Sequence, residues 1–88
     1  MSALRYSHAL HEQALDVLFG LRVSERRKIM DECASIVRAP FQEPDYQRTD
    51  EDGRLMSFVI RGRFAIAYWV DHGARLIWIT HIEIADLG

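Results

Sequence analysis

The chain has 88 residues, of which 49% are apolar and 27% charged, and its formal net charge is −2. This length allows one hydrophobic core, so we expect a single domain over residues 1–88, and the composition excludes intrinsic disorder. The charge excludes a uniformly cationic surface for nucleic acid, but it does not exclude a local basic patch.

The cysteine content and the N-terminal residues bear on the compartment. Cys33 is the single cysteine, which excludes an internal disulfide and a thiolate metal site. The N-terminus lacks the apolar run of a signal peptide, and no stretch reaches the roughly 18 apolar residues of a membrane-spanning helix. We therefore expect a cytoplasmic protein. Its small size favours association with a partner or with a second copy, as a homodimer.

The first half of the chain predicts two helices. Residues 7–19 show helical spacing of apolar residues, and Gly20 follows as a stop. A second helix begins at the N-cap residue Ser24 and ends before Ala39-Pro40. A short connection makes the pair a helical hairpin. Leu4-Arg5-Tyr6 is the candidate for an additional short edge strand.

The second half predicts a loop followed by strands. Residues 40–53 contain both prolines and several aspartates, which indicates a loop. After it, three runs are rich in β-branched and aromatic residues, and the gaps between them are short enough only for antiparallel hairpins: Leu55–Ile60, Phe64–Val70 and Leu76–Ile84. The expected fold class is α+β, with a helical hairpin packed on a C-terminal antiparallel β-meander.

The alternation of side chains predicts the two faces of this sheet. We place a turn at His72-Gly73, so that Asp71 lies opposite Ala74. The face expected to pack on the helices carries Phe64, Ile66, Tyr68, Ile77, Ile79 and His81. The other face carries Ala65, Ala67, Trp69, Leu76, Trp78 and Thr80. Small alanines beside tryptophans indicate a shallow apolar surface, so Trp69 and Trp78 are candidate partner-binding residues.

Arginines are concentrated in the sheet half of the chain. Guanidinium groups suit phosphate oxygens, so the candidates for nucleic-acid contact are Arg54, Arg61, Arg63 and Arg75. Trp69, Trp78 and Tyr68 are then available to stack on bases. The alternative is that these arginines keep strand edges soluble and pair with acidic neighbours.

Histidines are the other candidate chemical groups. His81 and Glu83 share a strand face, where the carboxylate can assist proton transfer by the imidazole; alternatively, His81 packs at the border of the core. His8 and His11 lie one helical turn apart, but no third ligand is evident, so we predict no metal and no cofactor. The acidic residues around Arg48 indicate a solvated loop or a surface for a basic segment. Cys33 is expected to be an inert core residue.

The order of elements and several phrases resemble the RelE/ParE superfamily of toxins from bacterial type II toxin–antitoxin systems. The phrases are Ala14-Leu15 with Leu18 and Leu21, Ile36–Pro40, and Gly62–Asp71, which is similar to the central strand of the family. The resemblance covers nearly the whole chain. It implies a RelE/ParE-like fold and a cognate antitoxin as partner.

In the mRNA-cleaving branch, the resemblance implies metal-independent, ribosome-dependent cleavage by basic residues on the concave sheet face. The family arginine of the central strand corresponds here to Ala65, either native or engineered, which implies a degraded or disarmed basic site. The candidate catalytic residues are then Arg61 and Arg63 for phosphate contact and His81 as general base. Two alternatives stay open: a non-enzymatic, ParE-like inhibitor of DNA gyrase, and a catalytically inactive protein-binding module.

Overall fold

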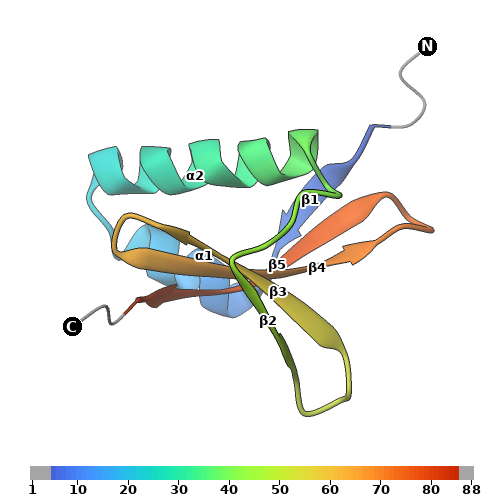
Figure 1. Cartoon of the computed structure of the whole chain (residues 1–88). Helices are drawn as coiled ribbons and strands as arrows, with labels where there is room; N and C mark the ends of the chain where they lie inside the picture. The colour runs from blue at the N-terminus through green and yellow to red at the C-terminus, as the bar shows by residue number, and fades with distance from the viewer. Residues whose placement is uncertain (1–4, 86–88) are drawn as a thin grey trace.

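The computed structural model describes residues 5–85 as two helices and a five-stranded sheet (Figure 1). In chain order the elements are β1 Ser7–Leu10, α1 Glu12–Phe19, α2 Val23–Arg38, β2 Tyr46–Thr49, β3 Leu55–Arg61, β4 Phe64–Asp71 and β5 Leu76–Ile84. The prediction of an α+β fold with helices preceding an antiparallel sheet is confirmed. No helix in this described range is both long and apolar enough to cross a membrane.

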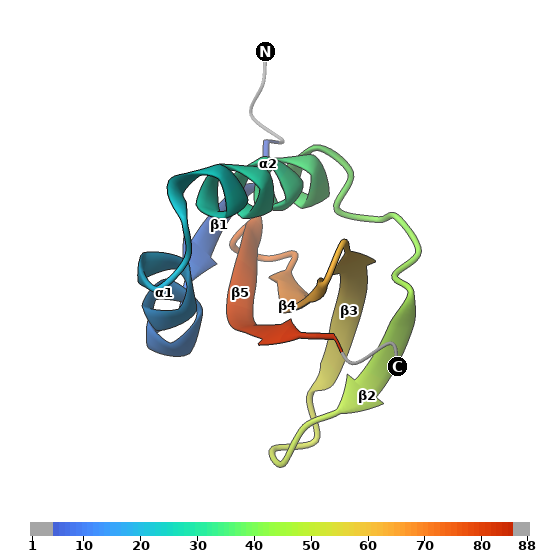
Figure 2. The same ribbon diagram turned by 90° about the vertical axis from the view of Figure 1, so that its left-hand side faces the viewer.

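The sheet is ordered β1-β5-β4-β3-β2. Strands β2 to β5 form antiparallel pairs between neighbours, whereas β1 pairs in parallel with β5 at the far edge. Figure 2 shows α1 beside β1 and α2 across one end of the strands. Buried residues of both helices pack in one cluster with Ile66, Ile77 and Ile79 of the sheet, so the helices lie on one sheet face and leave the other uncovered.

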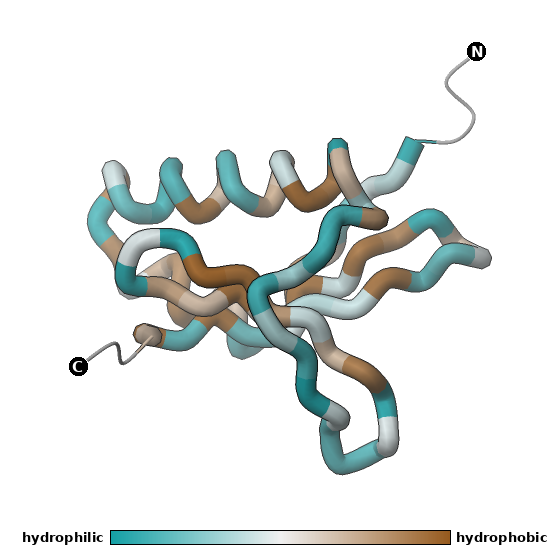
Figure 3. The backbone as a smooth tube through the Cα atoms, viewed as in Figure 1, coloured by the Kyte–Doolittle hydropathy of each residue, from teal (hydrophilic) through white to brown (hydrophobic). Residues whose placement is uncertain are grey.

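The core lies between the helices and one face of the sheet. In Figure 3 the hydrophobic stretches of α2 lie on the side of the helix that faces the strands. Ile29, Cys33 and Ile36 recur with helical spacing and are buried. They pack in one cluster with Ala14 and Leu18 of α1. The strands contribute the predicted helix-facing set, which is confirmed for Phe64, Ile66, Tyr68, Ile77 and Ile79. Each fully buried isoleucine stabilises the fold by roughly 1.5–3 kcal/mol.

The start of the chain differs from the prediction. Ser7–Leu10 is a strand, and the helix predicted from residue 7 begins only at Glu12. The Ser7 amide donates to the Arg75 carbonyl and the His11 amide to the Ile79 carbonyl, which ties this segment to β5. A four-residue strand ahead of an eight-residue helix is too short to show its own period. Of the predicted edge strand, Leu4 lies outside the described residues, and Arg5 and Tyr6 precede β1.

The predicted loop over residues 40–53 contains strand β2, so the sheet is larger than the predicted three-stranded meander. All four residues of β2 are exposed. An edge strand that is exposed on both faces lacks the apolar alternation by which strands are recognised. The composition of this segment therefore indicated only a loop.

The register between β4 and β5 also differs from the prediction. Asp71 lies opposite Leu76 and not Ala74, because the turn spans residues 72–75 and is closed by the Ala74 amide donating to Asp71 Oδ1. This two-residue shift preserves the predicted faces near the turn. Farther along, a bulge leaves Thr80 unpaired and sets His81 opposite Ala67. The placement of His81 on the helix-facing side was therefore wrong, and the residue lies on the opposite face.

Candidate functional site

The sheet face turned away from the helices, here called the outward face, has its own apolar cluster. Met56, Phe58 and Ala67 are buried there, and Trp69 packs against them. The register places Trp69 opposite Trp78, and their rings lie 6.3 Å apart at 19°. Tyr46 of β2 stacks on Phe58 with ring centroids 4.6 Å apart. The outward face therefore presents two aromatic stacks.

Two exposed arginines lie over these stacks. The guanidinium carbon of Arg48 is 4.6 Å from the centroid of Phe58, and that of Arg54 is 4.2 Å from Trp69. Such cation–π contacts contribute about 0.5–1 kcal/mol each at exposed sites. They hold the flat face of the guanidinium and leave its N–H edge available to anions. Arg48 was not among the predicted site residues, because its strand was taken for a loop.

A pocket of about 260 Å³ opens on the outward face between β2, β3, β4 and the end of β5. It is lined by Arg48, Thr49, Asp50, Met56, Phe58, Ala67, Thr80, His81 and Glu83. His81 and Glu83 project from β5 on the same side, as predicted, and both are exposed. The pocket therefore combines a cationic guanidinium, an imidazole and carboxylates within one small space.

The His81 ring forms a hydrogen bond with the buried hydroxyl group of Thr80. His81 Nδ1 lies 3.0 Å from Thr80 Oγ1, and that hydroxyl donates to the Ala67 carbonyl oxygen at 3.4 Å. Thr80 is itself only 7% exposed and occupies the bulge. The bulge therefore determines both the face on which His81 lies and the direction of its ring.

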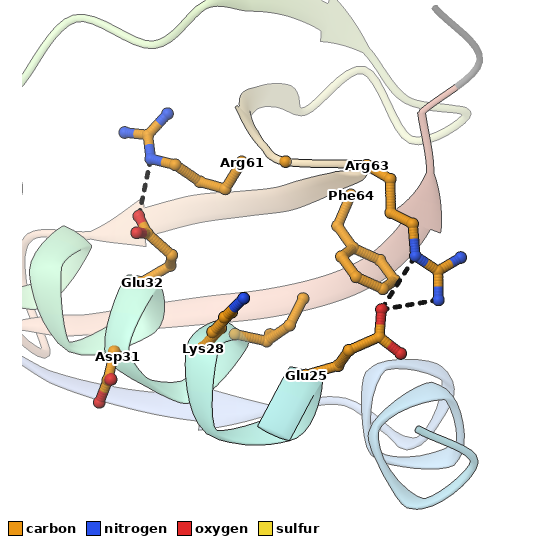
Figure 4. Close-up of a pocket in the computed structure, with 9 residues that line it drawn as sticks. Glu25, Lys28, Asp31, Glu32, Arg61, Arg63 and Phe64 are labelled. Atoms are coloured by element: carbon orange, nitrogen blue, oxygen red, sulfur yellow. Dashed lines mark hydrogen bonds and ion pairs between the residues drawn. The ribbon is translucent and has the colours of Figure 1, made fainter. Parts of the chain in front are cut away.

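The predicted arginines Arg61 and Arg63 lie elsewhere, at the turn between β3 and β4. Arg61 Nε donates to Glu32 of α2 at 2.7 Å and Arg61 Nη1 lies 3.4 Å from Asp45. Arg63 contacts Glu25 at 2.8 Å, as Figure 4 shows. These contacts line a pocket of about 460 Å³ on the helix side. The structure thus brings Arg61 and Arg63 together but separates them from His81.

The other predicted arginines lie away from this turn. Arg54 immediately precedes β3 and lies over Trp69, whereas Arg75 is in the turn that joins β4 to β5. Arg75 has a positive φ of 52° and its carbonyl accepts from the Ser7 amide. Because β3 and β4 are antiparallel, these two arginines flank the end of β4 opposite to Arg61 and Arg63. The four predicted residues do not form one phosphate clamp.

The remaining candidate groups are structural. Burial and, to a lesser extent, the Glu32 carboxylate raise the pKa of Cys33 to about 11, so its thiol is not activated. Burial likewise raises the pKa of Tyr68. His8 belongs to β1, whereas His11 stands at the N-cap position of α1 and contacts Trp78 edge-on, so they are not neighbours on one helix. Within residues 5–85, no group of three potential ligands has the geometry of a metal site.

Comparisons with known proteins rest on structure alone, since no family model and no curated protein matches the sequence. A chain of the RelBE2 toxin–antitoxin complex from Mycobacterium tuberculosis matches with a TM-score of 0.76 and 16% identity, covering 91% of this chain and 98% of that one. The RelE–RelB complex of Pyrococcus horikoshii matches with a TM-score of 0.74 and 12% identity, covering 97% and 99%.

The isolated RelE toxin of E. coli gives a similar result. Its TM-score is 0.75 at 15% identity, and the match covers 94% of this chain and 87% of that one. The three matches therefore cover most of this chain and most of each matched chain. The expectation raised by the central-strand phrase is confirmed at the level of architecture: the protein has the fold of the RelE toxins.

Proposed function

We propose that the protein is the toxin of a type II toxin–antitoxin pair and that it cleaves RNA, without a metal, in the pocket on the outward face. One observation carries the proposal: Arg48, His81 and Glu83 line the same 260 Å³ pocket. The fold shared with RelE toxins supports it. The role of His81 as general base is retained from the sequence, and Arg48 takes the phosphate-binding role first assigned to Arg61 and Arg63.

The proposed reaction is internal transesterification of RNA. His81 Nε2 accepts the proton of a ribose 2′-hydroxyl, the 2′-oxygen forms a bond to the adjacent phosphorus, and the bond from phosphorus to the 5′-oxygen breaks. The leaving 5′-oxygen takes a proton from solvent. Arg48 stabilises the charge that develops on the phosphorane, and Glu83 stabilises the imidazolium that forms. The products carry a 2′,3′-cyclic phosphate and a 5′-hydroxyl.

In this proposal, the aromatic stacks beside the pocket bind the bases of the RNA. Bases on either side of the scissile phosphate stack on Tyr46 and on Trp78, the outer members of the two stacks, and Arg54 contacts the backbone. In this proposal Arg61 and Arg63 hold the hairpin of β3 and β4 onto α2, because carboxylates of the same chain already occupy their guanidinium groups.

The test is cleavage of free RNA in the presence of EDTA, and cleavage of mRNA on translating ribosomes in their usual magnesium buffer. We expect fragments with 2′,3′-cyclic phosphate ends, and a rate lower by about 10²–10⁴ after His81→Ala. Arg48→Ala and Glu83→Gln should also reduce the rate, whereas Lys28→Ala, on the helix side, should not. Intact RNA under both conditions with the wild-type protein would refute the proposed activity.

The proposed partner is an antitoxin, which the RelE–RelB and RelBE2 complexes support by analogy. A segment that covers Trp69 and Trp78 would block the pocket beside them. We expect growth arrest on expression of the toxin alone, relief on co-expression with its antitoxin, and a change in tryptophan fluorescence when the two purified proteins mix. An unchanged emission spectrum on complex formation would contradict this location for the interface.

A second candidate function is non-enzymatic inhibition of a protein target such as DNA gyrase. Ala65 favours it, because it lies on the outward face where the resemblance implies an arginine, and it is buried. A supercoiling assay separates the two candidates: inhibition that persists in His81→Ala favours the gyrase target. Sedimentation of the isolated protein tests the homodimer, which would appear at twice the monomer mass.

A further inference from the structure

Thr80 is a buried polar residue at the one irregular point in the pairing of β4 with β5. It is 7% exposed, and apart from Tyr68 and Cys33 no other residue with a polar side-chain group in residues 5–85 is buried to that extent. The bulge leaves it without a partner in the ladder, between Ile79 in the core and His81 in the pocket. A buried hydroxyl requires hydrogen bonds, and here both of its bonds lead toward the proposed active site.

Only one assignment of protons makes both contacts of Thr80 hydrogen bonds. The hydroxyl has a single proton, and the Ala67 carbonyl oxygen, 3.4 Å away, can only accept it. At the 3.0 Å contact with His81 Nδ1 the hydroxyl oxygen is therefore the acceptor. This assignment puts the proton of the neutral imidazole on Nδ1. Nε2 then has the free lone pair.

We propose that Thr80 is a positioning residue that holds neutral His81 as its Nδ1–H tautomer, with Nε2 available as a base in the pocket. The opposite tautomer, which is the commoner one in free histidine, would put the lone pair against the Thr80 oxygen and leave Nε2 unable to accept a proton. The effect on cleavage rests on the proposed function, whereas the tautomer is a property of the folded chain by itself.

The first experiment measures the tautomer without RNA. Nitrogen NMR of the imidazoles is recorded at alkaline pH for the wild type, Thr80→Ser and Thr80→Val, and the His81 signals are identified by their loss in His81→Gln. We expect Nδ1–H in the wild type and in Thr80→Ser, and a shift toward Nε2–H in Thr80→Val. Nε2–H in the wild type, or an unchanged tautomer in Thr80→Val, would overturn the inference.

The second experiment links the tautomer to the reaction. If only the Nδ1–H form accepts the 2′-hydroxyl proton, kcat of Thr80→Val should fall by the same factor as its Nδ1–H population, with KM unchanged and with recovery in Thr80→Ser. A loss of kcat that does not follow the population would refute the positioning role. If every protein shows the expected tautomer and none cleaves RNA, the proposed function is refuted and the inference about the ring is supported.

Folding is monitored by circular dichroism and by thermal denaturation, because valine removes a hydrogen bond to the Ala67 carbonyl. If Thr80→Val does not fold, Thr80→Ala provides the same loss of the hydroxyl in a smaller side chain. A folded Thr80→Ala that retains the wild-type tautomer and kcat would overturn the inference.

Discussion

The salt dependence of RNA binding distinguishes the outward face from the helix side as the nucleic-acid surface. On the outward face, the guanidinium groups of Arg48 and Arg54 lie over aromatic rings and form no ion pair with a described residue. On the helix side, Arg61 and Arg63 are already neutralised by Glu32 and Glu25. We therefore expect replacement by alanine to remove a phosphate contact at Arg48 or Arg54, but not at Arg61 or Arg63.

The magnitude follows from counterion release. Each phosphate contact with single-stranded nucleic acid adds about 0.7 to the slope of log K against log salt, so the outward pair contributes about 1.4. A fourfold increase in salt should weaken binding by about sevenfold through both contacts, and by about 2.6-fold through the one contact that remains in Arg48→Ala or Arg54→Ala. Arg61→Ala and Arg63→Ala should leave the slope unchanged.

The assay is fluorescence anisotropy of a labelled single-stranded RNA, titrated with protein at several salt concentrations. All variants carry His81→Ala, so that the RNA stays intact during the measurement. The reasoning is refuted if Arg61→Ala or Arg63→Ala lowers the slope as much as Arg48→Ala does. A slope that no variant changes would also refute it, because the outward guanidinium groups would then contact no phosphate.

Three further predictions concern stability. Burial raises the pKa of Cys33 from 9.0 to about 11, so the native state retains the proton longer. Its free energy of unfolding in urea should therefore fall, relative to Cys33→Ala, by about 1.4 kcal/mol per pH unit above pH 9.0 until about pH 11; parallel curves would contradict this. Gly62→Ala should cost about 1–2 kcal/mol in thermal denaturation, because φ is +59°, unlike Gly73→Ala. Ile79→Ala should cost about 2–5 kcal/mol, and a smaller loss would mean that the core is loosely packed there.

The longer helix and the longer strands could be predicted from the sequence. The 16-residue helix α2 repeats its apolar spacing over about two turns, at Ile29, Cys33 and Ile36, and β3, β4 and β5 are dense in β-branched and aromatic residues. Strands β1 and β2 have four residues each, and β2 is fully exposed. Their positions depend on hydrogen bonds to β5 and β3, which no local pattern reveals.

The candidate site was predictable only in part. The spacing of two between His81 and Glu83 correctly placed both on one face. The sequence does not reveal whether a guanidinium group is free to bind phosphate. Arg61 is paired with Glu32, which is 29 positions away in the chain. Arg48 was missed for the complementary reason, since the rings beneath it come from two strands and only one of these was recognised.

The bulge connects these observations. Had β4 and β5 kept one register throughout, period-two alternation from Ile79 would have directed His81 into the core, next to Tyr68 and Ile66, as the sequence suggested. A single unpaired residue, Thr80, reverses the alternation beyond it, so that Ile82 enters the core and His81 lies in the pocket. The same residue contributes the hydroxyl that orients the ring. A local irregularity that costs one ladder pairing thus places the imidazole in the pocket, and in the proposed mechanism it also selects the nitrogen that acts as base.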